Sequence, residues 1–207
     1  ISFTHTLHIE GNGRVINDGD LYLKGDLINN GTTEEAFTYT GTSKVHFIGD
    51  IQQIQGSQSS IFYNVVFNNS STLLEGTIEV NNDADFTKGI VQNDETEGVF
   101  FFGELSDHIN TSNLSFVNGS VLKKGSLDFN FPIGNGSQYR PALIEGLTTD
   151  DNLISSRYLN QDSNALYPHD LKGDDIDFID NKEYWELERM DGTDFVILTL
   201  SRNAATS

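Results

Sequence analysis

Four aspartates near the end of the chain form its densest group of side chains that can coordinate a metal ion: Asp174, Asp175, Asp177 and Asp180. Hard cations such as Ca²⁺ prefer several oxygen ligands on a flexible loop, and this segment supplies them. The spacing departs from that of an EF-hand loop, which has glycine at its sixth position and glutamate at its twelfth. We therefore name Ca²⁺ as the candidate cofactor and these aspartates as its ligands, with a solvated acidic loop as the alternative.

Two other spacings resemble known sites but fail on geometry. His5 and His8 have the spacing of metal ligands, but on a strand residues three apart face opposite sides. Ser120 and Lys123 match a Ser-x-x-Lys pattern that is used in acyl transfer. That pattern needs a helix to bring both residues to one face, and here it falls in a predicted strand. Neither spacing predicts a site.

Acid–histidine neighbours and acid pairs are the candidates for hydrolysis: Asp107–His108, His169–Asp170, Asp18 with Asp20, and Asp83 with Asp85. Neighbouring residues on a strand point apart, which argues against a triad. The two acid pairs would share a face if they lay in strands, at a separation suited to acid–base work or Ca²⁺. The Gly, Asn or Ala beside them favours turns instead. We predict no enzyme and assign no catalytic residue.

Charge and composition narrow the class of protein. The 207 residues include 31 acidic and 12 basic ones, for a formal net charge of −19. A surface this negative repels nucleic-acid phosphates and anionic lipids, so we expect neither partner. Cysteine is absent, which excludes disulfides and thiolate chemistry. No apolar run approaches the roughly 18 residues of a membrane span, so no membrane insertion is expected.

A short pattern of apolar residues around a glycine recurs five times, with glycines at positions 25, 49, 76, 103 and 125. A mean period of about 25 residues is typical of stacked repeats, and the strand-forming residues favour one β-coil per repeat. We expect the five glycines to align along one edge. If Gly49 has a positive φ there, Gly49→Val costs about 1–3 kcal/mol.

Local patterns also predict corners and a buried strand. Asn68–Asn69 and Asn81–Asn82 each end a short strand, and asparagine suits corners because it tolerates left-handed backbone and bonds its own main chain. Asparagines of successive coils can also form a ladder. The range Val99–Phe102 is the most apolar of the chain and predicts a fully buried strand.

The pattern changes near residue 130, after which all three prolines occur. Residues 1–130 are therefore predicted to form a β-solenoid, and residues 131–207 a small all-β unit that caps its open end. The predicted fold class is all-β, with a right-handed parallel β-solenoid followed by a small sandwich-like domain.

Several segments carry a resemblance to a family. Phe131–Pro141 resembles an "FP-hG-x-G…YRP" segment of large cell-surface proteins of Bacteroidota. Glu183–Leu187 and Val196–Ser201 resemble the "EYW" and "h-T-L-S" strands of the small β-domain in those proteins. Val45–Gly56 and Phe62–Val65 are similar to their β-helical repeats. Together these segments span most of the chain.

The resemblance implies a secreted, extracellular protein of the cell surface, exported by type IX secretion and active in adhesion, gliding motility or a surface layer. Its partners would be other domains of the same protein, the export machinery, and glycans or other surface ligands. The usual C-terminal sorting domain has no match, so we expect the protein to continue beyond Ser207.

These inferences favour a non-catalytic structural or adhesive module. Two alternatives remain open: a β-helix that binds or processes carbohydrate, and a spike component of a phage or injection machine. Tyrosine or tryptophan in a groove would favour the carbohydrate alternative, and a trimer of intertwined chains would favour the spike.

Overall fold

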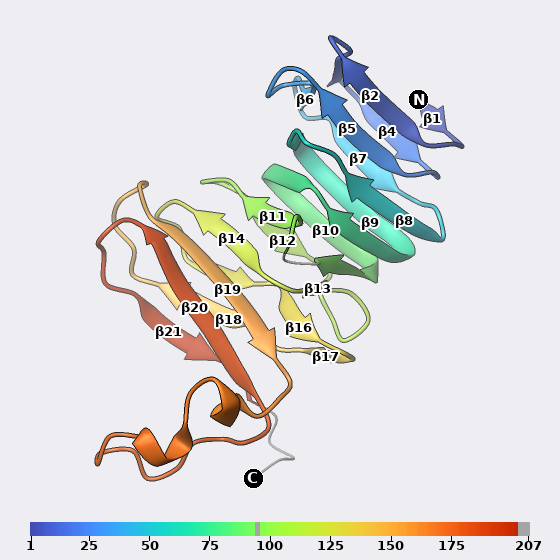
Figure 1. The fold of residues 1–207 in the computed structure, drawn as a ribbon. Helices are drawn as coiled ribbons and strands as arrows, with labels where there is room; N and C mark the ends of the chain where they lie inside the picture. Colours follow the sequence, from blue (N-terminus) through green and yellow to red (C-terminus); the bar gives the residue numbers. More distant parts are fainter. Residues whose placement is uncertain (94–95, 203–207) are drawn as a thin grey trace.

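The strands of this protein wind into a parallel β-solenoid, as Figure 1 shows for the computed structural model. The structure describes residues 1–93 and 96–202. Each short strand follows from alternation in the sequence: in β4 (Asp20–Leu23), Leu21 and Leu23 point into the core while Tyr22 points outward. The predicted all-β solenoid with a following small sheet is confirmed.

The coils have three faces, each built of parallel strands. Face 1 contains the strands β1 (Ser2–Phe3), β4, β7 (Lys44–Phe47) and β12 (Asp107–Ile109). Face 2 contains β2 (Leu7–Gly11), β5 (Leu27–Gly31), β8 (Ile51–Gln55), β13 (Val117–Asn118) and β16 (Ile133–Asn135). Face 3 contains β3 (Val15–Asn17), β6 (Phe37–Tyr39), β11 (Val99–Phe102) and β14 (Val121–Lys124). The long strands β9 (Ser60–Glu75) and β10 (Thr77–Asn93) bend through all three faces.

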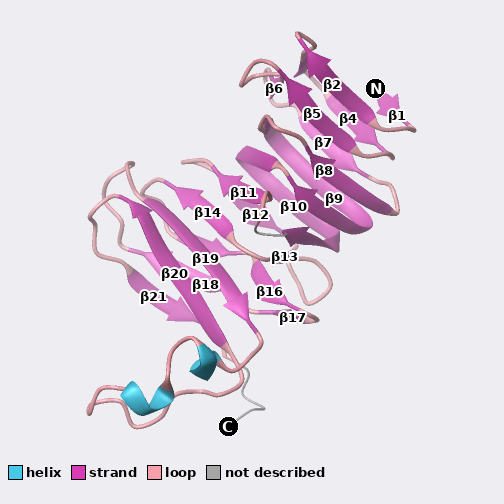
Figure 2. Ribbon diagram, in the orientation of Figure 1, coloured by secondary structure: helices cyan, strands magenta, loops and turns pink. Residues whose placement is uncertain are grey.

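Antiparallel strands follow the solenoid at its C-terminal end. β19 (Leu153–Leu159) pairs with β14, and β20 (Tyr184–Asp191) pairs with β19, so both extend face 3. β17 (Gln138–Tyr139) forms a hairpin with β16. A separate three-stranded sheet contains β15 (Phe129–Phe131), β18 (Ala142–Glu145) and β21 (Ile197–Leu200). Figure 2 shows two short 3₁₀ helices, η1 (Ser163–Ala165) and η2 (His169–Leu171), in the connection between β19 and β20.

One hydrophobic core runs through the stacked coils and into the C-terminal strands, from Ile9 to Tyr158. Its centre is a chain of phenylalanine rings in which neighbours lie 5.0–6.0 Å apart between centroids: Phe47, Phe67, Phe86, Phe100, Phe102 and Phe129. Stacked and tilted contacts of this kind stabilise a core beyond simple burial of apolar area. The coils therefore share one continuous interior.

The prediction that the five repeat glycines align along one edge is wrong. Gly25 and Gly49 follow face 1, Gly76 follows face 2, and Gly103 and Gly125 follow face 3. The coils differ in length, since Phe3, Leu23, Phe47 and Phe67 pair at spacings of 20, 24 and 20 residues. Because the coils differ in length, residues that recur at the average period fall at different corners of the solenoid.

The reason for glycine at position 49 also differs from the prediction. Gly49 does not have a positive φ, but a Cβ atom there would lie 2.3 Å from the carbonyl oxygen of Lys24. Close approach of two coils, rather than backbone conformation, requires glycine at this corner.

Amides fill the corners, as the asparagine pairs predicted, but the strands do not end there, because β9 continues through Asn68–Asn69 and β10 through Asn81–Asn82. Asn69 is buried and Asn82 is half-buried. Asn69 donates to Gln52 at 3.2 Å and to Thr72 at 2.8 Å, and Asn82 donates to Asn64 at 2.8 Å. A ladder also forms on face 2, where Asn135 donates to Asn118 and Asn118 donates to Gln92. These amides hold successive coils in register.

The prediction that the strand Val99–Phe102 is fully buried is wrong. Phe100 and Phe102 are fully buried, while Val99 and Phe101 are half-buried on the outer side. An apolar run therefore still alternates between two faces of a sheet.

Candidate functional site

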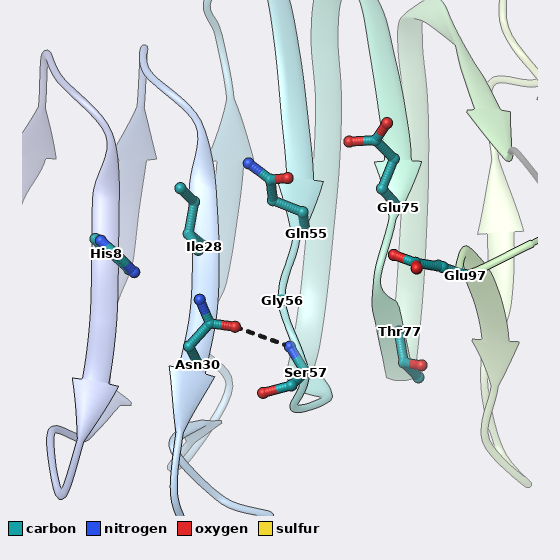
Figure 3. Close-up of a pocket in the computed structure, with 9 residues that line it drawn as sticks. All are labelled: His8, Ile28, Asn30, Gln55, Gly56, Ser57, Glu75, Thr77 and Glu97. Atoms are coloured by element: carbon teal, nitrogen blue, oxygen red, sulfur yellow. Dashed lines mark hydrogen bonds between the residues drawn. The ribbon is translucent and has the colours of Figure 1, made fainter.

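A groove with a volume of about 770 Å³ crosses the outside of face 2. We call it the face 2 groove. Figure 3 shows the residues that line it: His8, Ile28, Asn30, Gln55, Gly56, Ser57, Glu75, Thr77 and Glu97. They belong to successive coils and lie side by side because the strands of face 2 are parallel and adjacent.

Strand register sets the order of side chains in this groove. Ile28 pairs with both His8 and Gln55, and Gln55 pairs with Glu75, so these four residues form a row across the coils (Figure 3). Gly56 turns the chain beside this row with a φ of +129°, and a Cβ atom there would lie 2.2 Å from the backbone oxygen of Asn29. Only glycine fits at this place.

The chemistry of the face 2 groove is hydrogen bonding. Its lining includes the Gln55 amide, the Ser57 and Thr77 hydroxyls, and the Glu75 carboxylate. Among the lining groups, Asn30 Oδ1 accepts from the backbone N–H of Ser57 at 3.0 Å (Figure 3), and His8 Nε2 lies 3.1 Å from Glu10. An elongated groove of mixed donors and acceptors suits an extended ligand rich in hydroxyl groups.

A second groove, of about 520 Å³, lies on face 3 and brings aromatic rings beside charged groups. Tyr39 and Phe101 line it together with Glu79, Glu104 and Lys124, and the Lys124 ammonium lies 2.7 Å from Glu104. This hydrogen bond to Glu104 raises the pKa of Lys124. We call this the face 3 groove.

The predicted calcium ligands lie in the loop between η2 and β20. Asp174, Asp175 and Asp177 are exposed, and Asp180 accepts a hydrogen bond from the backbone N–H of Lys182 at 2.8 Å. Within residues 1–93 and 96–202, no three or more histidine or acidic side chains are grouped closely enough to hold a metal ion. The calcium site stays a prediction.

The candidate histidines serve different local roles. His108 lies among the rings of Phe86, Phe102 and Phe129, and its Nε2 contacts the backbone oxygen of Asn130. Burial lowers the pKa of His108. His108 is half-buried against these rings, and its neighbour Asp107 contacts its backbone N–H rather than its ring.

His169 reveals a contact that the sequence did not predict. Its Nε2 lies 3.0 Å from the Ser163 hydroxyl and 3.4 Å from the Asp162 carboxylate. In a catalytic triad the acid and the serine contact opposite nitrogens of the histidine. Here both contact the same nitrogen, so the group fixes the η1–η2 connection and is not arranged as a triad.

Three residues of the two acid pairs, namely Asp20, Asp83 and Asp85, make hydrogen bonds. Asp83 and Asp85 lie in β10, not in a turn as predicted, and Asp85 accepts from Thr87 and Asn110. Asp20 also lies in a strand, β4, and not in the predicted turn, whereas Asp18 lies outside the strands. Asp20 is 2.9 Å from His46, and this hydrogen bond lowers the pKa of Asp20.

The Ser-x-x-Lys pattern falls at a strand, β14, as the sequence predicted, and not on a helix. The buried Lys123 ammonium donates to the backbone oxygens of Gly103, Glu104 and Ser106 at 2.7–3.1 Å. Burial lowers the pKa of Lys123 to about 8. Lys123 therefore closes the last corner between faces 3 and 1.

The segments that carried the family resemblance meet in a buried network. Arg140 Nε lies 3.3 Å from the Glu183 carboxylate, and Tyr158 donates to the same oxygen at 2.6 Å. Trp185 donates to the backbone oxygen of Arg140 at 3.1 Å. All except Trp185 are almost fully buried, so these residues join β17 and β18 to β19 and β20.

Comparison of the chain with known protein families, with curated proteins and with solved structures found no match. No helix among the described residues has the length and apolar character needed to cross a membrane. The class that the structure defines is therefore a parallel β-solenoid with an antiparallel cap.

Proposed function

We propose that this chain is a non-catalytic structural and adhesive module of a larger extracellular protein on a bacterial cell surface. The observation that carries the proposal is the single core from Ile9 to Tyr158, which makes the stacked coils one rigid body. Solenoids of this kind are extended by adding coils, so they suit reaching outward and presenting long surfaces to partners. The net charge of −19 keeps such a surface soluble.

The face 2 groove supplies the adhesive surface in this proposal. Its polar groups come from several coils, so a ligand that binds along it must be elongated, as a glycan chain is. The sequence carries the further expectation of type IX secretion, a role in gliding motility and partner domains in the same protein. These remain part of the proposal.

A second candidate function is the binding or processing of carbohydrate, and the face 3 groove favours it. Tyr39 and Phe101 lie beside the Glu79 and Glu104 carboxylates there. Sugars bind in grooves that combine aromatic rings with a few directed polar groups.

Incubation with a panel of neutral and acidic polysaccharides separates these functions. We expect glycan binding on an array without release of reducing ends or unsaturated products. Gln55→Ala should weaken that binding if the face 2 groove is the adhesive surface, and Tyr39→Leu should weaken it if the face 3 groove is. Reproducible turnover that Glu75→Gln or Glu79→Gln abolishes would overturn the non-catalytic proposal.

A further inference from the structure

A third groove lies on the outer side of β20, where the connection that carries η1 folds back over the sheet. We call it the β20 groove; it has a volume of about 520 Å³ and is lined by Ser163, Tyr167, Tyr184, Trp185, Glu186, Leu187 and Glu188. A smaller hollow beside it shares Glu186 and Glu188 and adds Ser120, Ser155 and Arg157. Strand β20 supplies the floor and Tyr167 supplies one wall.

Two tyrosine rings form a corner in this groove. The centroids of Tyr167 and Tyr184 are 6.1 Å apart and their planes meet at 76°. Hydrogen bonds fix both rings, since Tyr167 donates to Glu186 at 3.3 Å and Gln161 donates to the Tyr184 hydroxyl at 3.2 Å. Tyr167 is 55% exposed, so one side of the corner is open to a ligand.

The charge of the β20 groove is negative. Glu186 is neutralised by Arg157, whose Nε lies 2.5 Å from the carboxylate. Glu188 is exposed, and among the described residues its carboxylate has no ion pair or hydrogen bond. The groove therefore keeps a surplus negative charge, and the negative charge of the whole chain reinforces it.

We propose that the β20 groove binds a small molecule that carries a quaternary ammonium group. Aromatic rings set at an angle attract such cations through their faces, and a nearby carboxylate adds charge complementarity. An anionic ligand is repelled here, and a bare metal ion gains little from the two rings. The inference is independent of the adhesive role proposed above, because β19 and β20 contribute nothing to the face 2 groove.

Choline and 3,3-dimethylbutan-1-ol test the proposal, because the two molecules share a shape and differ in the charged nitrogen. Isothermal titration calorimetry measures this binding, because the Trp185 ring packs against Tyr158 on the core side of β20 and would not report it directly. We expect saturable binding of choline at constant ionic strength and at least tenfold weaker binding of the neutral alcohol.

Variants locate the site. Tyr167→Leu should raise the Kd for choline about tenfold, while Tyr167→Phe, which keeps the ring, should stay within about twofold of the parent. Glu188→Gln should raise the Kd about two- to fivefold. Tyr22→Leu, a matched change on face 1, should leave the Kd unchanged, and a thermal melt of each variant checks its fold.

Three results would overturn the proposal. The first is no saturable binding of choline to the intact chain at 100 mM, a concentration well above about a millimolar Kd. The second is equal binding of choline and the neutral alcohol, which defines a plain apolar pocket. The third is choline binding that Tyr167→Leu does not weaken, which places the ligand elsewhere.

Discussion

The inner corners of the solenoid and the joint at its C-terminal end both bury polar groups, but they use different chemistry. Along the solenoid the corners contain neutral amides: the fully buried Gln52 donates to the backbone oxygens of Leu23 and Gly25. At the joint, charged groups are buried instead, namely Lys123 and the Arg140–Glu183 pair.

This difference in chemistry follows from the hydrogen-bond partners that are available to a buried side chain in each region. Within the stack, the next coil presents backbone groups at a fixed distance, so an amide finds its partners by repetition. Where β19 runs antiparallel to β14, the parallel stacking stops. Lys123 in β14 still donates to backbone oxygens of the preceding coil, whereas Arg140 beyond it pairs with the Glu183 carboxylate. Charged side chains reach farther, and a pair of them fixes one docking geometry, although removing one partner leaves an unpaired buried charge.

Of the changes proposed here, Glu183→Gln at the joint should cause the largest loss of stability. The change leaves the buried Arg140 guanidinium without its charged partner and weakens the acceptor of the Tyr158 hydroxyl. We expect a loss of about 3–5 kcal/mol in the free energy of unfolding. Urea denaturation followed by circular dichroism measures it, with the exposed Glu34→Gln as the control. A loss equal to that of the control would show that the joint does not depend on the ion pair.

Gly49→Ala tests the solenoid side of the comparison. The added Cβ atom would lie 2.3 Å from the Lys24 carbonyl oxygen, so two coils must separate at this corner. We expect a loss of about 1–3 kcal/mol. Gly19 is the matched control, because a Cβ atom there meets nothing within 4 Å and its φ is not positive. If both variants lose the same stability, close coil contact is not the reason for glycine at position 49.

Lys123 gives the joint a pH dependence that the amide corners lack. Burial lowers the pKa of Lys123 to about 8 in the folded protein, against 10.5 for an ordinary lysine. Between these values the unfolded chain holds the proton and the folded chain has lost it, so stability rises as pH increases from 8 to 10.5. Below pH 8 both states are protonated and the burial penalty is complete.

Lys123→Met should remove this rise, which is measured as the difference in unfolding free energy between variant and parent across that pH range. A parallel pH dependence in the two proteins would contradict the assignment and show that the three carbonyl acceptors keep Lys123 protonated.

Calcium should have the smallest effect on stability, because its predicted ligands Asp174, Asp175 and Asp177 are exposed. A cation that binds only the folded loop raises the melting temperature by mass action. The sequence prediction therefore expects a higher melting temperature in millimolar Ca²⁺ than in excess EDTA, and Asp175→Asn should remove the difference. An unchanged melting temperature would reject the calcium site.

The sequence by itself determined the elements and their general arrangement. Alternating apolar residues in segments such as Leu21–Leu23 specify which side of a strand is buried, and Asn69 and Asn82 specify corners. These features are local: each depends on a few neighbouring residues and on the period of two in a strand. Absence of cysteine and the strong negative charge followed directly from composition.

Only the tertiary structure decided which residues meet across coils. His8, Ile28, Gln55 and Glu75 form one row although their sequence spacings are unequal, because the coils differ in length and the pairing register absorbs the difference. The same holds for the ion pair of Arg140 with Glu183, and for Tyr167 with Tyr184, which a folded connection brings together. Strand register is fixed by the summed packing and hydrogen bonding of whole coils. The residues that line the grooves and the buried charged pairs therefore meet only in the folded structure.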